Sequence, residues 1–241
     1  MSATDRRAQA TVVGVAILLG LTVLAVGGLT ATAGSIVSEG AASAAATRVA
    51  DDLEAALAPG AGGRETTVAL ASGRIRVTNR TVWLLDEGGV VWAGHAGAIT
   101  YADGDQRVTG FAGAVVRSDG RESRVVAPSR IAPANGTLYV GVPVLNASGA
   151  DGITTGGHRL AVVLRTDAET TRTDLPAADY RIGVETPTPA AWERHLRARG
   201  ATTTRRDVDG DGIPSVVATF PGRRTVSLLV HDVRLDVAVG R

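Results

Sequence analysis

Three aspartates at alternate positions form the cluster in this chain that is best suited to binding a metal ion. Residues 207–212 read Asp-Val-Asp-Gly-Asp-Gly. Alternate carboxylates in a turn can converge on a hard cation, and glycine permits the turn. A twelve-residue calcium loop ends in a bidentate Glu, but the twelfth position here would be Ala218. Two interpretations follow: a calcium site with Asp207, Asp209 and Asp211 as ligands, or an acidic β-turn.

Three Asn-x-Ser/Thr sequons begin at Asn79, Asn135 and Asn146. Each is a candidate N-glycosylation site if the domain that carries it lies outside the cell. Asn135 is the best placed of the three, because it lies in a Pro-Ala-Asn-Gly turn. The sequons therefore predict a glycoprotein only together with an extracellular location.

Residues typical of catalytic sites do not occur in a matching pattern. There is no Cys, which excludes disulfides, thiolate catalysis and Cys-ligated metals. Neither a Gly-x-Ser-x-Gly elbow nor a Lys-containing phosphate loop occurs. The four histidines are dispersed, and we expect His195, beside Trp192 on an Arg-rich segment, to lie on the surface. We therefore expect no enzyme activity and no cofactor other than calcium.

The charge balance argues against a nucleic-acid partner. The 241 residues have a formal net charge of +1, and all 25 basic residues are Arg. Without a basic excess, the sequence does not predict the positive surface that a nucleic-acid-binding domain needs.

The N-terminal segment has the length and polarity of a membrane anchor. No charged side chain occurs from Ala8 to Ser38, which exceeds the roughly 20 apolar residues needed to cross a bilayer. Arg6 and Arg7 before this run place the N-terminus in the cytoplasm by the positive-inside rule. The sequence thus predicts a single-pass protein in contact with membrane lipid, with everything after Glu39 outside the cell. A cleaved secretory signal does not fit, because its apolar core has only 7–15 residues.

The segment Arg6-Arg7-Ala8-Gln9-Ala10, placed directly before the apolar run, resembles the class III signal of archaeal type IV pilins and archaellins. The residues that follow, from Thr11 on, also resemble a haloarchaeal pilin N-terminus, and the resemblance covers about 40 residues. In that family a prepilin peptidase cuts before the helix, which stays on the mature protein. The resemblance implies cleavage between Ala8 and Gln9, with Arg6 to Gln9 as the processing site.

An Ala-rich stretch continues from the apolar run. One row of small and apolar residues recurs every four positions, which predicts an amphipathic helix that ends at Pro59-Gly60. The members of this row are Val37, Ala41, Ala45, Val49, Leu53 and Leu57. A continuous helix over residues 9–58 would be about 75 Å long, with its second half against a globular domain.

From Glu65 the hydrophobic pattern changes to that of short strands. These predict a mainly antiparallel β-rich domain resembling a sandwich. The expected strands are 66–71, 74–79, 82–86, 90–93, 97–101, 114–117, 124–127, 137–145, 158–166 and 180–185.

One helix and a closing hairpin are expected near the C-terminus. Thr188 is a candidate cap and Gly200 a candidate end of the helix. Residues 215–220 and 225–239 are expected to pair around Pro221-Gly222. Because the apolar alternation changes phase at His231-Asp232, we expect a β-bulge or a bend there.

The combined prediction is an α+β protein with four parts: a leader at 1–8, a transmembrane and stalk helix at 9–58, a Gly-rich linker at 59–64, and a β-rich ectodomain at 65–241 with one short helix. The expected function is that of a major or minor type IV pilin-like subunit of haloarchaeal type with a structural or adhesive role in a pilus. Its expected partners are prepilin peptidase and like subunits through the N-terminal helix. The alternative is a non-assembling, membrane-anchored surface ectodomain that binds a ligand or a protein.

Overall fold

The computed structural model describes residues 38–58, 64–148, 153–154 and 160–240. The predicted leader at 1–8, with the processing site Arg6 to Gln9, lies outside the described residues. So do residues 9–37 of the predicted helix and 59–63 of the predicted linker. The chain divides into two compact units, Met1–Ser43 and Ala44–Arg241. The elements described below belong to the second unit unless stated.

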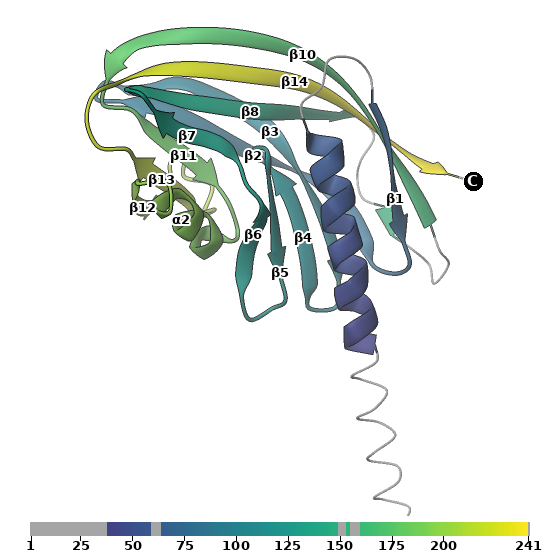
Figure 1. The fold of residues 1–241 in the computed structure, drawn as a ribbon. Coiled ribbons are helices and arrows are strands. Elements are labelled where there is room, and N and C mark those ends of the chain that lie inside the picture. The colour runs from purple at the N-terminus through teal and green to yellow at the C-terminus, as the bar shows by residue number, and fades with distance from the viewer. Residues whose placement is uncertain (1–37, 59–63, 149–152, 155–159, 241) are drawn as a thin grey trace, which may run out of the picture. The chain divides into compact units, whose positions relative to one another are not determined.

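Two sheets make up most of the second unit (Figure 1). A five-stranded sheet has the order β1-β10-β14-β8-β7, in which β14 and β8 are parallel and the other neighbours antiparallel. Its strands are β1 (Arg64–Leu70), β7 (Arg130–Ala134), β8 (Thr137–Ser148), β10 (Leu160–Ala178) and β14 (Arg224–Gly240).

The second sheet is antiparallel throughout, with the order β12-β13-β11-β2-β3-β4-β5-β6 and β9 paired to β2. We call it the nine-stranded sheet. Its strands are β2 (Arg74–Asp86), β3 (Gly89–Asp103), β4 (Gln106–Phe111), β5 (Ala114–Ser118), β6 (Ser123–Ala127), β9 (Ile153–Thr154), β11 (Arg181–Glu185), β12 (Thr202–Arg206) and β13 (Ser215–Thr219).

The predicted fold class is wrong. Instead of an α+β protein led by a long transmembrane and stalk helix, the described chain is mostly antiparallel β-structure with two helices. The N-terminal helix is described only over residues 38–57. Arg48, Asp51 and Glu54 occur along it and are exposed, so it is amphipathic.

Among the described residues no helix is long and apolar enough to cross a membrane, which overturns the predicted single-pass anchor.

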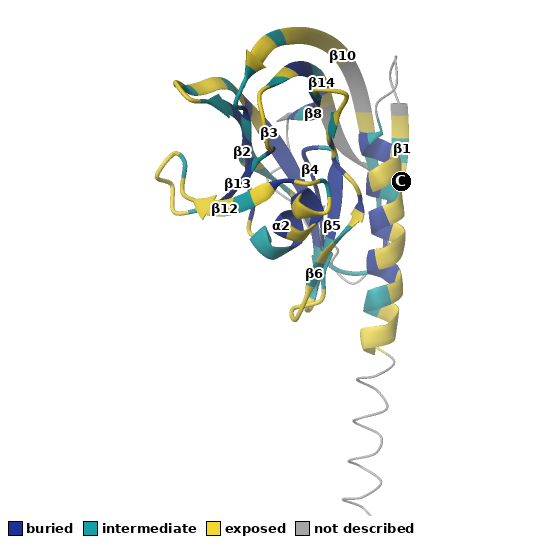
Figure 2. Cartoon of the chain, turned by 60° about the vertical axis from the view of Figure 1, so that its left-hand side comes forward, coloured by how far each residue is buried: buried dark blue, intermediate teal, exposed yellow. Residues whose placement is uncertain are grey.

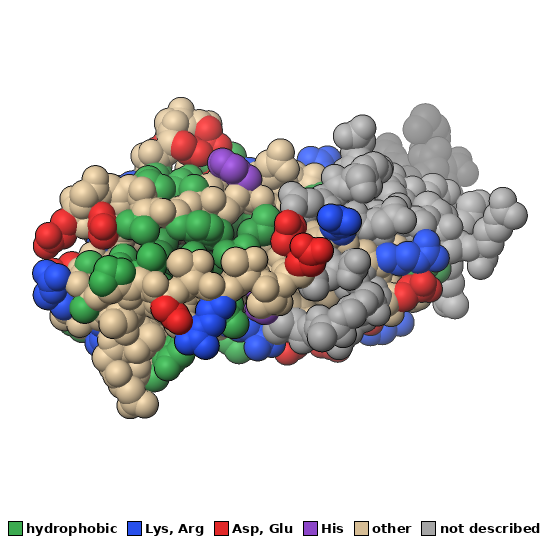
Figure 3. Space-filling model, turned by 90° about the horizontal axis from the view of Figure 1, so that it is seen from above, with side chains coloured by type: hydrophobic (Ala, Val, Ile, Leu, Met, Phe, Trp, Pro, Cys, Tyr) green, Lys and Arg blue, Asp and Glu red, His purple; other side chains and the backbone are tan. Residues whose placement is uncertain are grey.

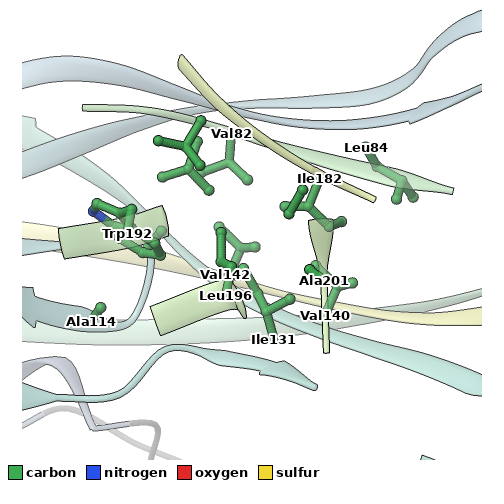
Figure 4. Close-up of a cluster of buried hydrophobic side chains, with 14 of the residues drawn as sticks. Val82, Leu84, Ala114, Ile131, Val140, Val142, Ile182, Trp192, Leu196 and Ala201 are labelled. Atoms are coloured by element: carbon green, nitrogen blue, oxygen red, sulfur yellow. The ribbon is translucent and has the colours of Figure 1, made fainter. Parts of the chain in front are cut away.

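One hydrophobic core fills the space between the five-stranded sheet, the nine-stranded sheet and a short helix, α2 (Pro189–Arg197). Figure 4 shows Val140 and Val142 of β8 near Trp192 and Leu196 of α2. Phe111 meets Trp192 edge-on, with ring centroids 6.4 Å apart. We call this cluster the α2 core.

A second core lies under the N-terminal helix. The buried residues of the helix are small or branched, so its backbone comes close to the sheets. A Cβ at Gly110 of β4 would lie 2.5 Å from Leu57 Cδ1, so any larger residue at this position would force the Leu57 side chain to shift. Figure 2 shows one side of the helix buried and the other exposed. The helical members of this helix core are Ala46, Val49, Ala50, Leu53, Ala56 and Leu57.

The two cores lie on opposite faces of the same strands. In β14, Leu228 belongs to the α2 core and Val233 to the helix core. In β8, Val142 and Leu145 divide in the same way. Both pairs are an odd number of residues apart, and the pairing of β14 with β8 is continuous, so the side chains point to opposite faces.

This arrangement corrects the predicted bulge. The phase change at His231-Asp232 is real, but β14 pairs with β10 through these residues without a register shift. The shift in that pair lies instead between Leu175 and Ala178. A strand that buries one face and then the other gives the same phase change as a bulge.

The predicted closing hairpin is also wrong. β13 pairs with β11 and β12, whereas β14 pairs with β10 and β8, so the two predicted arms belong to different sheets. Pro221-Gly222 therefore connects the sheets, and Gly222 has a φ of 79°.

The five-stranded sheet has an outer face that is partly apolar. Figure 3, seen from above, shows hydrophobic side chains gathered between acidic and basic groups. Leu138 and Val140 point into the α2 core, so Tyr139 between them points outward and is 44 % exposed.

Candidate functional site

The acidic segment lies in the loop between β12 and β13, and one of its aspartates shapes the loop. Asp207 accepts hydrogen bonds from the backbone N–H groups of Gly210 at 2.7 Å and Gly212 at 2.9 Å. Both glycines have φ near 80°, which L side chains rarely adopt. Asp211 accepts from the N–H of Ile213 at 2.8 Å. The Asp and Gly residues thus fold the turn by local contacts.

The group of three carboxylates that the fold brings together includes Glu185, which the sequence did not predict as a ligand. One carboxylate oxygen from each of Glu185, Asp209 and Asp211 lies within 4.8 Å of the others. Asp207, predicted as a ligand, does not belong to this group of three. Glu185 ends β11 and Ser215 begins β13, and these two are register partners, so the start of β13 is held beside Glu185.

Glu185 is a buried acid with incomplete hydrogen bonding. The residue is 3 % exposed, and its Oε2 accepts the Thr81 N–H at 2.9 Å. Its Oε1 lies 3.1 Å from Arg80 Nη1 but has no hydrogen bond of good geometry. Burial raises the pKa of the Glu185 carboxyl, Asp211 and Asp209 raise it further, and the Thr81 N–H and Arg80 act in the opposite direction.

A small pocket opens beside this glutamate. It has about 30 Å³ of room for water-sized groups. Its lining residues include Thr78, Thr100, Thr109 and Thr188, together with the Arg80–Glu185 pair, Phe111 and Trp192. The pocket thus combines hydrogen-bonding groups with an apolar wall, and its volume suits water or one small polar group.

His195 is buried, not on the surface as predicted. It is 9 % exposed, and its Nε2 lies 2.9 Å from Ser129 Oγ. Burial and the neighbouring Arg199 lower its pKa to about 4. In a Ser–His–Asp triad a carboxylate faces the other ring nitrogen, but here Arg199 Nη1 lies 3.0 Å from Nδ1. The pair therefore lacks the arrangement that activates a serine.

Two of the three sequons begin in strands, and the third begins in a turn. Asn79 is exposed in β2, and Asn135 is exposed in the turn between β7 and β8 with a φ of 49°. Asn146 lies in β8, where its register partner is Arg234 of β14. Because the extracellular location on which the glycoprotein prediction depends is overturned, that prediction is corrected as well, and two of the three asparagines are simply exposed polar residues.

Comparison with known proteins gives a family but no activity. Residues 7–236 match the model of a family described only as one of unknown function. No curated protein and no solved structure matches the chain significantly. The match covers the apolar run and the β-rich region together.

Proposed function

The chain belongs to this family of unknown function, DUF7289, and we propose that it is a type IV pilin-like structural subunit that is processed by a prepilin peptidase. The observation that carries the proposal is the sequence Arg6-Arg7-Ala8-Gln9 directly before an uncharged run that extends to Ser38. The first eight residues would be removed, and the uncharged segment would then contact the corresponding segments of related subunits.

The way the N-terminal helix joins the β-rich unit supports this role. Residues 44–57 are part of that unit, and their apolar side chains fill the helix core. A subunit held in an assembly through its N-terminal segment needs such a connection, because a load on that segment must reach the folded unit. Leu53 at 0 % and Val49 at 1 % exposure anchor the helix by apolar burial.

Mass spectrometry of the mature N-terminus tests the processing step. The full chain is expressed with and without an archaeal prepilin peptidase. We expect a mature chain that begins at Gln9 only when the peptidase is present. A double variant, Arg6→Gln with Arg7→Gln, should stay uncut, while the control Arg48→Gln should be cut normally. A chain that still begins at Met1 or Ser2 in the presence of the peptidase would overturn the proposal.

A second candidate function is a non-assembling surface domain that binds a ligand or a protein partner. The pocket beside Arg80 and Glu185, which has room for one small polar group, favours the ligand-binding form of this alternative. Filaments sheared from cells that express a tagged chain distinguish the two. Tagged chain in the filament fraction supports the pilin-like subunit, and a processed chain that is absent from filaments supports the binding domain.

A further inference from the structure

We propose that Glu185, Asp209 and Asp211 together bind a hard divalent cation, and that calcium is the ion that fits them best. The inference does not rest on the pilin-like function. It rests on the charges that the fold brings together and on the unsatisfied hydrogen bonding of Glu185.

The first argument is the concentration of negative charge. Three carboxylates contribute oxygens that lie within 4.8 Å of one another, and Arg80 provides a positive charge to one of them, Glu185. Like charges this close repel strongly wherever water is partly excluded. A divalent cation among the oxygens would neutralise the remaining two charges.

The second argument is independent of the cluster's composition. Glu185 Oε1 is buried, and it accepts no hydrogen bond although it faces Arg80. A buried carboxylate oxygen without a hydrogen bond is costly, so it is rare unless a further partner completes it. Ser215 Oγ, on the register partner of Glu185, is also buried without a hydrogen-bond partner. The one partner of Glu185 Oε1 in the described structure is the Arg80 guanidinium, which makes no hydrogen bond of good geometry to it, and a bound cation would complete the coordination of this oxygen.

The ligand types and distances favour calcium. All three side chains offer oxygen, which hard cations prefer. Two ligands on opposite sides of a calcium ion are separated by about 4.6–5.2 Å, twice the usual calcium–oxygen distance. Separations of up to 4.8 Å fit within that limit. Magnesium requires a near-octahedral shell at about 2.0–2.1 Å and usually keeps several waters with only one or two carboxylates, so a group of three carboxylates suits it less well.

The ion would link two parts of the fold. Glu185 ends β11, whereas Asp209 and Asp211 are exposed on the loop before β13. Asp207 holds the loop in shape instead, because its two oxygens accept hydrogen bonds from the N–H groups of Gly210 and Gly212. The bound ion would therefore fix the tip of the loop to the end of the strand.

Calorimetric titration of calcium chloride into the chelator-treated full chain tests the proposal. We expect saturable binding of one ion, with a Kd of roughly 10⁻⁴–10⁻³ M, the weak end of the range of calcium sites, because the site has only three carboxylates and lies partly on an exposed loop. Asp209→Asn with Asp211→Asn, on an exposed loop, should fold and weaken binding at least about tenfold. Glu185→Gln should weaken it to a similar degree. Asp119→Asn is the matched control, because Asp119 also accepts backbone N–H groups in an exposed turn but lies outside the cluster.

Three results would overturn the proposal. These are no calcium binding at millimolar concentration, wild-type affinity in the Asp209/Asp211 double variant, and wild-type affinity in a Glu185→Gln protein whose circular dichroism is native. If Glu185→Gln fails to fold, the loop double variant alone decides. Displacement of calcium by an equal concentration of magnesium would also contradict the choice of ion.

Discussion

The Ser129 backbone N–H and its Oγ both lie within hydrogen-bond distance of Nε2 of His195, at 3.2 and 2.9 Å. A backbone N–H and a guanidinium can only donate, so at least one ring nitrogen accepts and the imidazole is neutral. This contact joins the loop before β7 to α2. Protonation of the ring would place a buried charge beside the guanidinium of Arg199.

The stability of the protein should therefore fall in mild acid. The unfolded chain protonates His195 below its ordinary pKa of 6.5, whereas the folded chain does so only near 4. Because the unfolded state binds more protons in this window, the stabilisation is complete above pH 6.5 and is lost as pH falls to 4. We expect a loss of about 3 kcal/mol from this group. Urea denaturation at several pH values measures it.

The control for the pH effect is His195→Gln. Glutamine keeps a hydrogen-bonding group near Ser129 but does not titrate, so the difference in stability between variant and wild type should change between pH 6.5 and 4. A difference that stays constant across this range would mean that His195 does not cause the acid sensitivity.

Leu53→Ala should destabilise the β-rich unit by roughly 2–5 kcal/mol, because Leu53 is fully buried in the helix core. Glu54→Ala changes the neighbouring exposed residue and should have an effect within about 0.5 kcal/mol. Chemical denaturation followed by circular dichroism compares the two. Equal stabilities would show that the helix is not docked as described.

Gly97→Ala should destabilise the protein where β3 passes β8. A Cβ at this position would lie 2.9 Å from the Leu145 carbonyl oxygen and 2.9 Å from Val77 Cγ1. Because a backbone atom cannot move away easily, we expect a cost of about 1–3 kcal/mol. Gly40→Ala, in a helix with no atom within 4 Å of the new Cβ, should be neutral or stabilising. Thermal melting distinguishes the two variants.

Arg80→Met should leave the Glu185 carboxylate buried without its cation. Loss of one partner of a buried ion pair costs roughly 3–5 kcal/mol, and we expect the lower end because the Arg80 side chain is 19 % exposed. Adding Glu185→Gln should recover part of the loss. The cost of Arg80→Met should also shrink at low pH, where Glu185 becomes protonated. A cost that does not depend on Glu185 in the double-mutant cycle would contradict this account.

The sequence predicted most of the strands, but it divided β2 into two. Residues 74–79 and 82–86 were expected as separate strands, yet both belong to β2. The alternation breaks between them because Ile75 lies in the helix core and Val82 in the α2 core. A change of face within a strand has the same pattern as two strands separated by a turn.

Other elements lacked the signal on which a sequence-based prediction depends. β10 continues from the expected end at residue 166 to Ala178, although residues 169–174 are polar and exposed. Its pairing with β14 maintains the strand there without apolar alternation.

The predicted helix near Thr188 is present as α2, and Gly200 closes it with a φ of 85°. Thr188, however, makes no side-chain cap.

The acidic cluster could be predicted only in part. The Asp-Gly alternation identified the loop, but it could not distinguish Asp207, which holds the turn, from the two aspartates that face Glu185. Glu185 is more than twenty positions away in sequence and reaches the loop through the pairing of β11 with β13. His195 was placed on the surface because its neighbours are arginines, whereas Ser129 and Trp192 enclose it.

The strands that carry both cores have a consequence for cooperativity. β2, β8 and β14 each have side chains in the α2 core and in the helix core. Neither core can therefore unfold while the strands that line the other core stay folded. Local unfolding in proteins usually follows units that share few contacts with the remainder. Residues 44–241 should therefore unfold in a single calorimetric transition, in which two hydrophobic clusters behave as one thermodynamic unit.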